Sequence, residues 1–172
     1  MIKGRIHVYT GDGKGKTTAA IGLAVRAAGA GLRVFIAQFM KRGDYSEIAG
    51  LRPLADRVTV EQFGTGRFVR GAPDAEDLAA ARAGLERVAA VFAAGAHKLV
   101  VLDEANVAAA TGIVSTAELL ALLDSRPAGT EVVMTGRSAP AEVLERADLI
   151  TEMRAVRHYF QAGVAARKGI EK

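Results

Sequence analysis

A glycine-rich segment near the N-terminus carries the residue types that bind phosphate. Thr10 to Thr18 read T-G-D-G-K-G-K-T-T and directly follow the apolar run Ile6–Tyr9. Gly11, Gly13 and Gly15 allow backbone conformations in which successive N–H groups converge on phosphate oxygens. An alanine-rich stretch with helical character follows. A strand, a glycine-rich turn and a helix in this order predict a phosphate-binding loop.

Two side chains at the end of this segment add the remaining chemistry. Lys16 supplies a positive charge for the outer phosphates of a nucleotide, and the Thr17 hydroxyl is suited to be a magnesium ligand. The usual pattern begins with a glycine five positions before Gly15, where this chain has Thr10. We therefore predict a modified nucleotide site. The alternative is a glycine-rich turn with an incidental lysine.

A second candidate group lies at the end of an apolar run. Asp103 and Glu104 directly follow Leu99–Leu102, which is typical of a buried parallel strand. A carboxylate there can hold magnesium opposite a phosphate loop, directly or through water. Glu104 is a further ligand, a water-positioning base or an electrostatic element. The alternative is that Asp103 caps a helix.

The remaining pattern predicts the elements that position these groups. Strands are expected at Ile6–Tyr9, Val34–Gln38, Val58–Phe63, Leu99–Leu102, Glu131–Met134 and, as an edge strand, Leu149–Met153. Helices are expected at Thr18–Ala28, Ala75–Ala94 with Asp74 as cap, Thr116–Leu123 with Ser115 as cap, and from Pro140 through Arg146. We predict one α/β domain over residues 1–172, a doubly wound and mainly parallel sheet flanked by helices. Ligands of such sheets bind at the carboxyl ends of the strands.

Composition excludes several classes of protein. The 172 residues include no cysteine, which excludes disulfides, thiolate metal sites and a cysteine nucleophile. The first residues lead straight into a strand, so no signal peptide is expected, and no apolar run approaches the roughly 20 residues of a membrane span. A cytoplasmic location is expected. The net charge is +4, but the arginines are scattered and not interleaved with aromatic residues, so no nucleic-acid partner is expected.

Several further runs resemble one known family in order and spacing. They are Q-F-M-K (38–41), L-D-E-A-N-V-A (102–108), T-G-R-S-A-P (135–140), A-D-L-I-T-E-M (147–153) and R-H-Y-F-Q-A-G-V-A-A-R-K-G-I-E (157–171). Together with Y-T-G-D-G-K-G-K-T-T, they resemble the ATP:cob(I)alamin adenosyltransferases, the corrinoid adenosyltransferase family related to RecA-like ATPases. The resemblance covers essentially the whole chain, from about Ile6 to Glu171, and implies a P-loop architecture.

The resemblance implies an enzyme that transfers the 5′-deoxyadenosyl group of ATP to the reduced cobalt of a corrinoid and releases triphosphate. It implies ATP as co-substrate, magnesium or manganese, and a homodimer, with a reductant protein as a further partner. It also implies that ATP is held reversed relative to other P-loop proteins. That reversal suits the reaction, because negative charge gathers on the departing triphosphate, where the loop and a metal stabilise it.

The resemblance also assigns roles to residues of this chain. The ATP-binding residues it implies are Thr10, Gly11, Asp12, Gly13, Lys14, Gly15, Lys16, Thr17, Thr18, Gln38, Lys41, Glu47 and Arg137. Lys16, Thr17 and Glu104 are the expected catalytic groups, and Thr17, Asp103 and Glu104 are the expected metal site. Arg137 is either a phosphate clamp or a partner of a carboxylate on a neighbouring helix. Glu47 is either part of the ATP site or a surface carboxylate.

Two positions depart from the family's pattern on the corrinoid side. The family often shows G-x-G-F followed by an aromatic residue in the loop that displaces the lower corrinoid ligand, whereas Gly64-Thr65-Gly66 precedes Arg67-Phe68-Val69 here. Phe68 either supplies that wedge, shifted by one position, or anchors the loop on the core. The family's K-H-P-F is Arg157-His158-Tyr159-Phe160 here, and His158 either contacts corrinoid or a partner, or is structural.

Two other functions remain open from the residues alone. A P-loop NTPase or small-molecule kinase would use the same phosphate loop and Asp103-Glu104, although no arginine-rich lid segment is evident. An ATP-dependent binding module, such as a nucleic-acid clamp, is supported only by the net positive charge. Product analysis separates the adenosyltransferase from the NTPase or kinase, since an adenosyltransferase releases triphosphate and a kinase or NTPase releases a nucleoside diphosphate.

Overall fold

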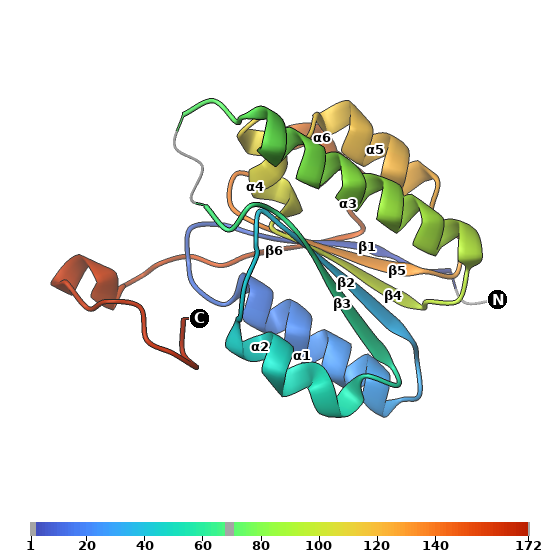
Figure 1. The fold of residues 1–172 in the computed structure, drawn as a ribbon, viewed down its shortest axis with the longest axis horizontal. Coiled ribbons are helices and arrows are strands. Elements are labelled where there is room, and N and C mark those ends of the chain that lie inside the picture. The colour runs from blue at the N-terminus through green and yellow to red at the C-terminus, as the bar shows by residue number, and fades with distance from the viewer. Residues whose placement is uncertain (1–2, 68–70, 172) are drawn as a thin grey trace.

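Six parallel strands form one sheet in the order β3-β2-β4-β5-β1-β6 in the computed structural model, which describes residues 3–67 and 71–171 (Figure 1). The strands are β1 (Ile6–Thr10), β2 (Val34–Phe39), β3 (Val58–Phe63), β4 (Leu99–Asp103), β5 (Glu131–Thr135) and β6 (Leu149–Glu152). Every residue of β2 and β4 is buried, because these strands are covered on both faces. The predicted edge strand is confirmed as β6, at one end of the sheet.

Helices cover both faces of the sheet, which confirms the doubly wound prediction (Figure 1). One face carries α1 (Lys16–Gly29) and α2 (Ser46–Leu51), and the other carries α3 (Ala75–Ala94), α4 (Ala105–Ala110), α5 (Thr116–Asp124) and α6 (Ala141–Arg146). Short 3-10 turns lie at Arg52–Leu54 and at Tyr159–Ala162. Within residues 3–67 and 71–171, no helix has both the length and the apolar character needed to cross a membrane.

The predicted helix starts at Asp74 and Ser115 are confirmed by their hydrogen bonds. Asp74 accepts from the backbone N–H groups of Glu76 and Asp77, and Ser115 Oγ accepts from that of Glu118. In both cases the acidic side chain at the third helical position reaches back to the cap residue's N–H, which completes a capping box. Each cap stabilises its helix by about 1 kcal/mol.

Helix α1 packs closely on the sheet through small side chains. Ala20 and Ala24 are fully buried against the core that contains Ile36 and Val101. Alanine allows a close approach between helix and sheet because its side chain ends at Cβ. This packing fixes the first turn of α1, with Lys16, beside the carboxyl ends of the strands.

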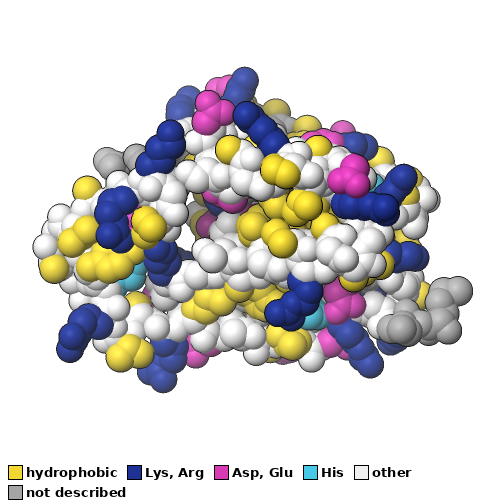
Figure 2. Space-filling model, turned by 90° about the horizontal axis from the view of Figure 1, so that it is seen from below, with side chains coloured by type: hydrophobic (Ala, Val, Ile, Leu, Met, Phe, Trp, Pro, Cys, Tyr) yellow, Lys and Arg dark blue, Asp and Glu magenta, His cyan; other side chains and the backbone are white. Residues whose placement is uncertain are grey.

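Charged side chains are dispersed over the face of the molecule that carries α1 and α2. In Figure 2, Lys and Arg side chains are spread over this face, with Asp and Glu between them and hydrophobic side chains among them. No single basic block gathers on this side. The view agrees with the scattered arginines of the sequence.

Candidate active site at the carboxyl ends of the strands

The phosphate loop turns between β1 and α1, and its backbone explains the unusual Thr10. Thr10 is the last residue of β1 and pairs with Glu152 of β6, so this position is extended and requires no glycine. The first left-handed residue is Gly11, with φ +92°, and a Cβ there would lie 2.5 Å from the Met153 carbonyl oxygen. Gly15, with φ +116°, is the N-cap residue that precedes α1. The departure from the usual motif therefore imposes no strain.

The side chain of Lys16 folds back onto the phosphate loop. Its Nζ donates to the carbonyl oxygens of Gly11 and Gly13, both at 2.7 Å, and the residue is 8% exposed. Burial lowers the pKa of Lys16, and the nearby positive charge of Arg137 lowers it further. Two cationic side chains thus act on the same small volume at the start of α1, where an anion is favoured.

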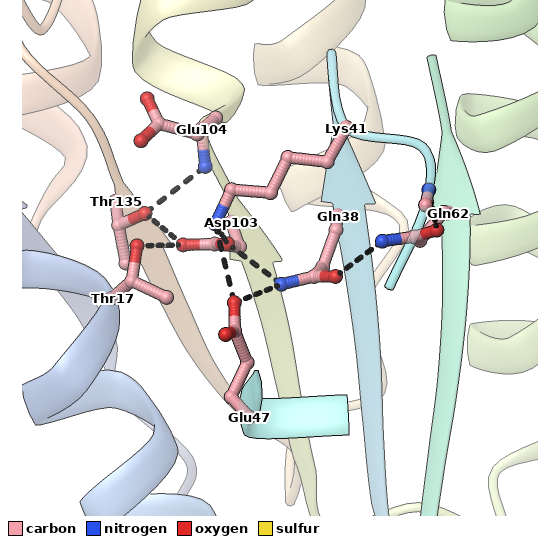
Figure 3. Close-up of polar contacts among 9 residues, drawn as sticks. Thr17, Gln38, Lys41, Glu47, Gln62, Asp103, Glu104 and Thr135 are labelled. Atoms are coloured by element: carbon pink, nitrogen blue, oxygen red, sulfur yellow. Dashed lines mark hydrogen bonds and ion pairs between the residues drawn. The ribbon is translucent and has the colours of Figure 1, made fainter. Parts of the chain in front are cut away.

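Asp103 is the centre of a buried hydrogen-bond network behind the loop (Figure 3). Its Oδ1 accepts from Thr17 Oγ1 at 2.8 Å and from Thr135 Oγ1 at 2.7 Å. Its Oδ2 accepts from Lys41 Nζ at 2.8 Å and from Gln38 Nε2 at 3.2 Å. Asp103 is 0% exposed, so these four donors replace the water it would otherwise bind.

Lys41 and Glu47 complete the network on the side of β2. Lys41 Nζ lies 3.6 Å from Glu47 Oε1, and Gln38 Nε2 donates to the same oxygen at 3.2 Å. Burial alone would lower the pKa of Lys41, but the carboxylates of Asp103, Glu47 and Glu104 together outweigh it, so the pKa of Lys41 is raised. Glu47 is therefore joined to the network and is not an isolated surface carboxylate.

Glu104 is held in an uncommon backbone conformation beside this network. Its φ is +60°, in the left-handed region, and its N–H donates to Thr135 Oγ1 at 3.0 Å. In Figure 3 its carboxylate points away from Asp103. Burial raises the pKa of Glu104, and the Asp103 charge raises it further. The backbone strain of such a residue, about 1–2 kcal/mol, is offset by the surrounding structure and is common at functional sites.

These elements surround a cavity of about 560 Å³. The candidate residues that line it are Gly13, Lys14, Gly15, Lys16, Thr17, Thr18, Lys41, Glu104, Arg137 and His158. Gln38, Glu47 and Asp103 lie behind this lining and reach it through Lys41 and Thr17. Thr10, Gly11 and Asp12 belong to the loop but do not line the cavity. The volume falls in the range of small-molecule sites.

Arg137 and His158 both line the cavity. Within the described part of the chain, Arg137 forms no ion pair, so the structure does not pair it with a carboxylate on a neighbouring helix. His158 Nδ1 accepts from the Phe160 N–H at 3.1 Å and caps the 3-10 turn at Tyr159–Ala162. That bond is a structural role, and the cavity position leaves the functional one open. Phe68 lies outside the described residues.

The C-terminal segment is attached to the phosphate loop. The Gly13 N–H donates to the Met153 carbonyl oxygen at 2.6 Å, where the chain leaves β6. Lys14 Nζ donates to Tyr159 Oη at 3.1 Å and to Glu171 Oε1 at 3.2 Å, and Tyr159 donates to the same carboxylate. In Figure 1 this segment extends from the sheet beside the loop that follows β1.

Sequence reasoning missed several residues of this region. Arg67, Ile170, Glu171, Met40, Val107 and Thr111 also line the cavity, and Gln62 and Thr135 belong to the Asp103 network. Thr135 could have been found, since it ends a strand just before Gly136 and Arg137. Gln62 could also have been found as a polar residue near the end of a strand. Glu171 could not, because its contact with Lys14 spans 157 positions.

The donor set fits a hard divalent cation bound together with phosphate. The Thr17 hydroxyl donates a hydrogen bond to Asp103, which leaves the lone pairs of Thr17 Oγ1 free. The Glu104 carboxylate accepts no hydrogen bond from a described residue. Such oxygens suit magnesium. The described residues form no cluster of three or more His, Cys, Asp or Glu that could hold a metal, so nucleotide oxygens and water would complete the shell. Asp103 is already fully hydrogen-bonded and supports Thr17 from behind.

A parallel, doubly wound sheet with a phosphate loop after its first strand and an acidic residue at the end of β4 defines a P-loop nucleotide-binding protein. The family model described as "ATP:corrinoid adenosyltransferase BtuR/CobO/CobP" matches residues 2–171. The chain belongs to this family, which confirms the resemblance seen in the sequence.

Three curated relatives agree with this assignment. A "Corrinoid adenosyltransferase" of Pseudomonas aeruginosa is 38% identical over 170 residues, which cover 98% of this chain and 84% of that protein. A protein of the same name from Escherichia coli K12 is 37% identical over 177 residues, 98% of this chain and 86% of its own length. The "Corrinoid adenosyltransferase CobA" of Salmonella typhimurium is 36% identical, with the same coverage of both chains.

Proposed function

We propose that this protein transfers the 5′-deoxyadenosyl group of ATP to the reduced cobalt of a corrinoid and releases triphosphate, in adenosylcobalamin biosynthesis or salvage. Membership of the corrinoid adenosyltransferase family supports this over a P-loop NTPase or kinase. The observation that carries the proposal is the convergence of the phosphate loop, Glu104 and Arg137 on one cavity. Residues 1–172 would form a single domain of this type.

The chemistry follows from where charge develops. The cobalt(I) of the substrate donates an electron pair to C5′ of the ribose, the C5′–O5′ bond breaks, and its electron pair leaves with the triphosphate. Lys16, Arg137 and the N–H groups at the start of α1 would lie against the departing oxygens, where negative charge increases. The ribose would then face the open cavity, so ATP would be held in the reversed orientation. The cobalt is the nucleophile, so the protein supplies position and electrostatic stabilisation.

Thr17 and Glu104 would hold magnesium, or manganese, with Asp103 orienting Thr17. When bound, the ion would neutralise part of the charge on the triphosphate. Lys41 would remain with Asp103 and Glu47 at the wall of the cavity and contact the nucleotide from the side of β2. The ATP-binding role of the other loop residues, Thr10 to Thr18, belongs to the same proposal.

The proposal also covers the corrinoid-side residues, the protein partners and the cellular location. His158 is proposed to lie on the corrinoid side, since it lines the cavity. Phe68 is proposed as a corrinoid-side residue from the family resemblance alone. A homodimer, a reductant protein as electron donor and a cytoplasmic location are proposed from the family resemblance. Equilibrium sedimentation would test the dimer, and a single species at the protomer mass would contradict it.

The reaction can be tested directly. Purified protein with ATP, magnesium and chemically reduced cob(I)alamin should give light-sensitive adenosylcobalamin, with triphosphate as the phosphorus-containing product in the phosphorus NMR spectrum. Release of ADP and orthophosphate without cobalt alkylation would instead support the NTPase or kinase. Repeating the assay with two or three corrinoids would identify the preferred substrate.

Lys16 is the matching test of the site. Lys16→Ala should lower turnover by about 100-fold or more, because the variant loses a charge that acts on the developing anion. Lys3→Ala is the control, since Lys3 is exposed and lies before β1, at the opposite end of that strand. An unchanged rate in Lys16→Ala would show that the loop does not hold the triphosphate.

A further inference from the structure

A row of amide side chains crosses the sheet beside the nucleotide site. Gln62 of β3 is in register with Gln38 of β2, and Gln38 is in register with Asp103 of β4. Gln62 Nε2 donates to Gln38 Oε1 at 3.1 Å, and Gln38 Nε2 donates to Asp103 Oδ2 and Glu47 Oε1, both at 3.2 Å (Figure 3). At the outer end, the Gly43 N–H donates to Gln62 Oε1 at 2.9 Å.

The orientation of the two amide groups in this row is determined by the neighbours at both ends. At one end the Gly43 backbone N–H can only donate, so it requires the oxygen of Gln62. At the other end the carboxylates of Asp103 and Glu47 can only accept when ionised, so they require the amide nitrogen of Gln38. Only one orientation of the two amides satisfies both conditions. The position of each amide nitrogen is therefore dictated by chemistry at its neighbours.

We propose that Gln62 is a positioning residue of the nucleotide site, which acts by fixing the orientation of the Gln38 amide. Gln38 is 0% exposed, so bulk solvent does not reach its amide to replace a lost partner. If its amide turned, its oxygen would face Asp103 and Glu47, and the carboxylate that orients Thr17 would lose a donor. Gln62 itself does not line the cavity, so its influence on nucleotide passes through Gln38.

The row also connects the site to the segment after β2. Gly43 lies two residues after Lys41, which donates to Asp103 at 2.8 Å, so this segment is connected to Asp103 both directly and through Gln62 and Gln38. Removing the Gln62 connection leaves the direct one in place. The proposal therefore predicts weakened nucleotide binding rather than a collapsed site. It rests on the proposed role of the cavity as a nucleotide site.

Two substitutions of Gln62 separate this role from a purely structural one. Gln62→Glu keeps the size of the side chain and still accepts from Gly43, but as a carboxylate it offers Gln38 only acceptors. Gln62→Met removes both hydrogen bonds and imposes no orientation on Gln38. Calorimetric titration with magnesium and ATP should show a loss of affinity of about 10-fold or more for Gln62→Glu and about threefold for Gln62→Met. A role in packing, or in holding Gly43 alone, predicts the reverse order.

A second measurement reports on Gln38 itself. In protein labelled with nitrogen-15 in the side-chain amides of its glutamines, Gln38, Gln62 and Gln161, the Gln38 resonances should move further in Gln62→Glu than in Gln62→Met. Gln161→Glu makes the same chemical change at an exposed position and should leave ATP affinity within about twofold. Wild-type affinity in Gln62→Glu, or an unmoved Gln38 signal, would overturn the proposal. Because titration needs no corrinoid, a wild-type protein that binds ATP but alkylates no cobalt would refute only the proposed reaction.

Discussion

Two groups of hydrogen-bonded charges are attached to the phosphate loop, one at Asp103 behind it and one at Glu171 in front of it. Asp103 is 0% exposed and accepts four hydrogen bonds from Thr17, Thr135, Gln38 and Lys41. The Glu171 carboxylate also has several donors, but the side chains of its partners Lys14 and Arg167 are 38% and 53% exposed. Water can replace the partners of Glu171 but not those of Asp103.

The comparison shows that the number of contacts does not decide the importance of a charged group. A buried carboxylate that loses a partner leaves an uncompensated charge, whereas an exposed pair is screened and its partners are resolvated. The Asp103 network should therefore determine stability and nucleotide affinity. The Glu171 cluster should determine mainly whether the C-terminal segment stays against the loop.

The largest effect is expected from Asp103→Ala. This change leaves the half-buried Lys41 ammonium with Glu47 as its remaining ion-pair partner and leaves three further donors of Asp103 unpaired, which should lower the free energy of unfolding by about 3–5 kcal/mol. Chemical denaturation measures the loss. In the double variant with Lys41→Met, both charges are removed, so the cost should be smaller than for Asp103→Ala alone. Strictly additive losses would mean that the two charges do not act as a pair.

A moderate effect is expected from the pH dependence of Glu104 in the absence of metal and nucleotide. Because its folded-state pKa is raised, Glu104 stabilises the fold at low pH, and this contribution is lost as pH rises from the ordinary value of 4.5 through the raised pKa. Glu104→Gln should remove that loss, so its stability relative to wild type should grow by up to about 1.4 kcal/mol per pH unit within this window. A difference that does not vary with pH would contradict the buried environment of Glu104.

The smallest effect is expected at Glu171. Hydrogen bonds from Arg167 and Tyr159 hold the pKa of Glu171 well below its usual range, so the cluster should be intact above pH 4.5 and be lost as pH falls through the folded-state pKa. Glu171→Gln should leave the thermal midpoint nearly unchanged, while amide exchange of residues 157–171 increases.

The control for this prediction is Glu61→Gln, which breaks the pair between Glu61 and Arg87 on β3 and α3. That change should leave exchange in residues 157–171 as it is in wild type. A large loss of stability in Glu171→Gln would place the C-terminal cluster in the same class as Asp103 and remove the contrast between the two groups.

The sequence predicted the strands well because they are short apolar runs or, as in Val58–Phe63, alternate apolar and polar side chains. Val58–Phe63 matches β3 at both ends, and Leu99–Leu102 falls one residue short of β4, since the buried Asp103 reads as polar. The helices α2 and α4 were missed. Each has only six residues and begins without a side-chain cap, and α4 starts from the left-handed Glu104, which no local pattern indicates.

The candidate site could be predicted only as far as local motifs reach. Lys16 and Thr17 follow from the loop sequence, and Asp103 follows from the end of a strand. The partnership of Gln62 with Gln38 depends on the register between β3 and β2, which the sequence alone does not specify. The contact of Lys14 with Glu171 depends on the path of the last residues, which is a tertiary property.

The hydrogen bond between the Gly13 amide and the Met153 carbonyl makes hydrogen exchange of Gly13 a measure of the motion of the loop. An amide proton engaged in this way exchanges slowly with deuterium oxide, and it is freed as soon as the strand end and the loop move apart. Its exchange rate would therefore record how often the two segments separate. A spectroscopist could follow that breathing motion at one backbone position, with no dye or spin label added.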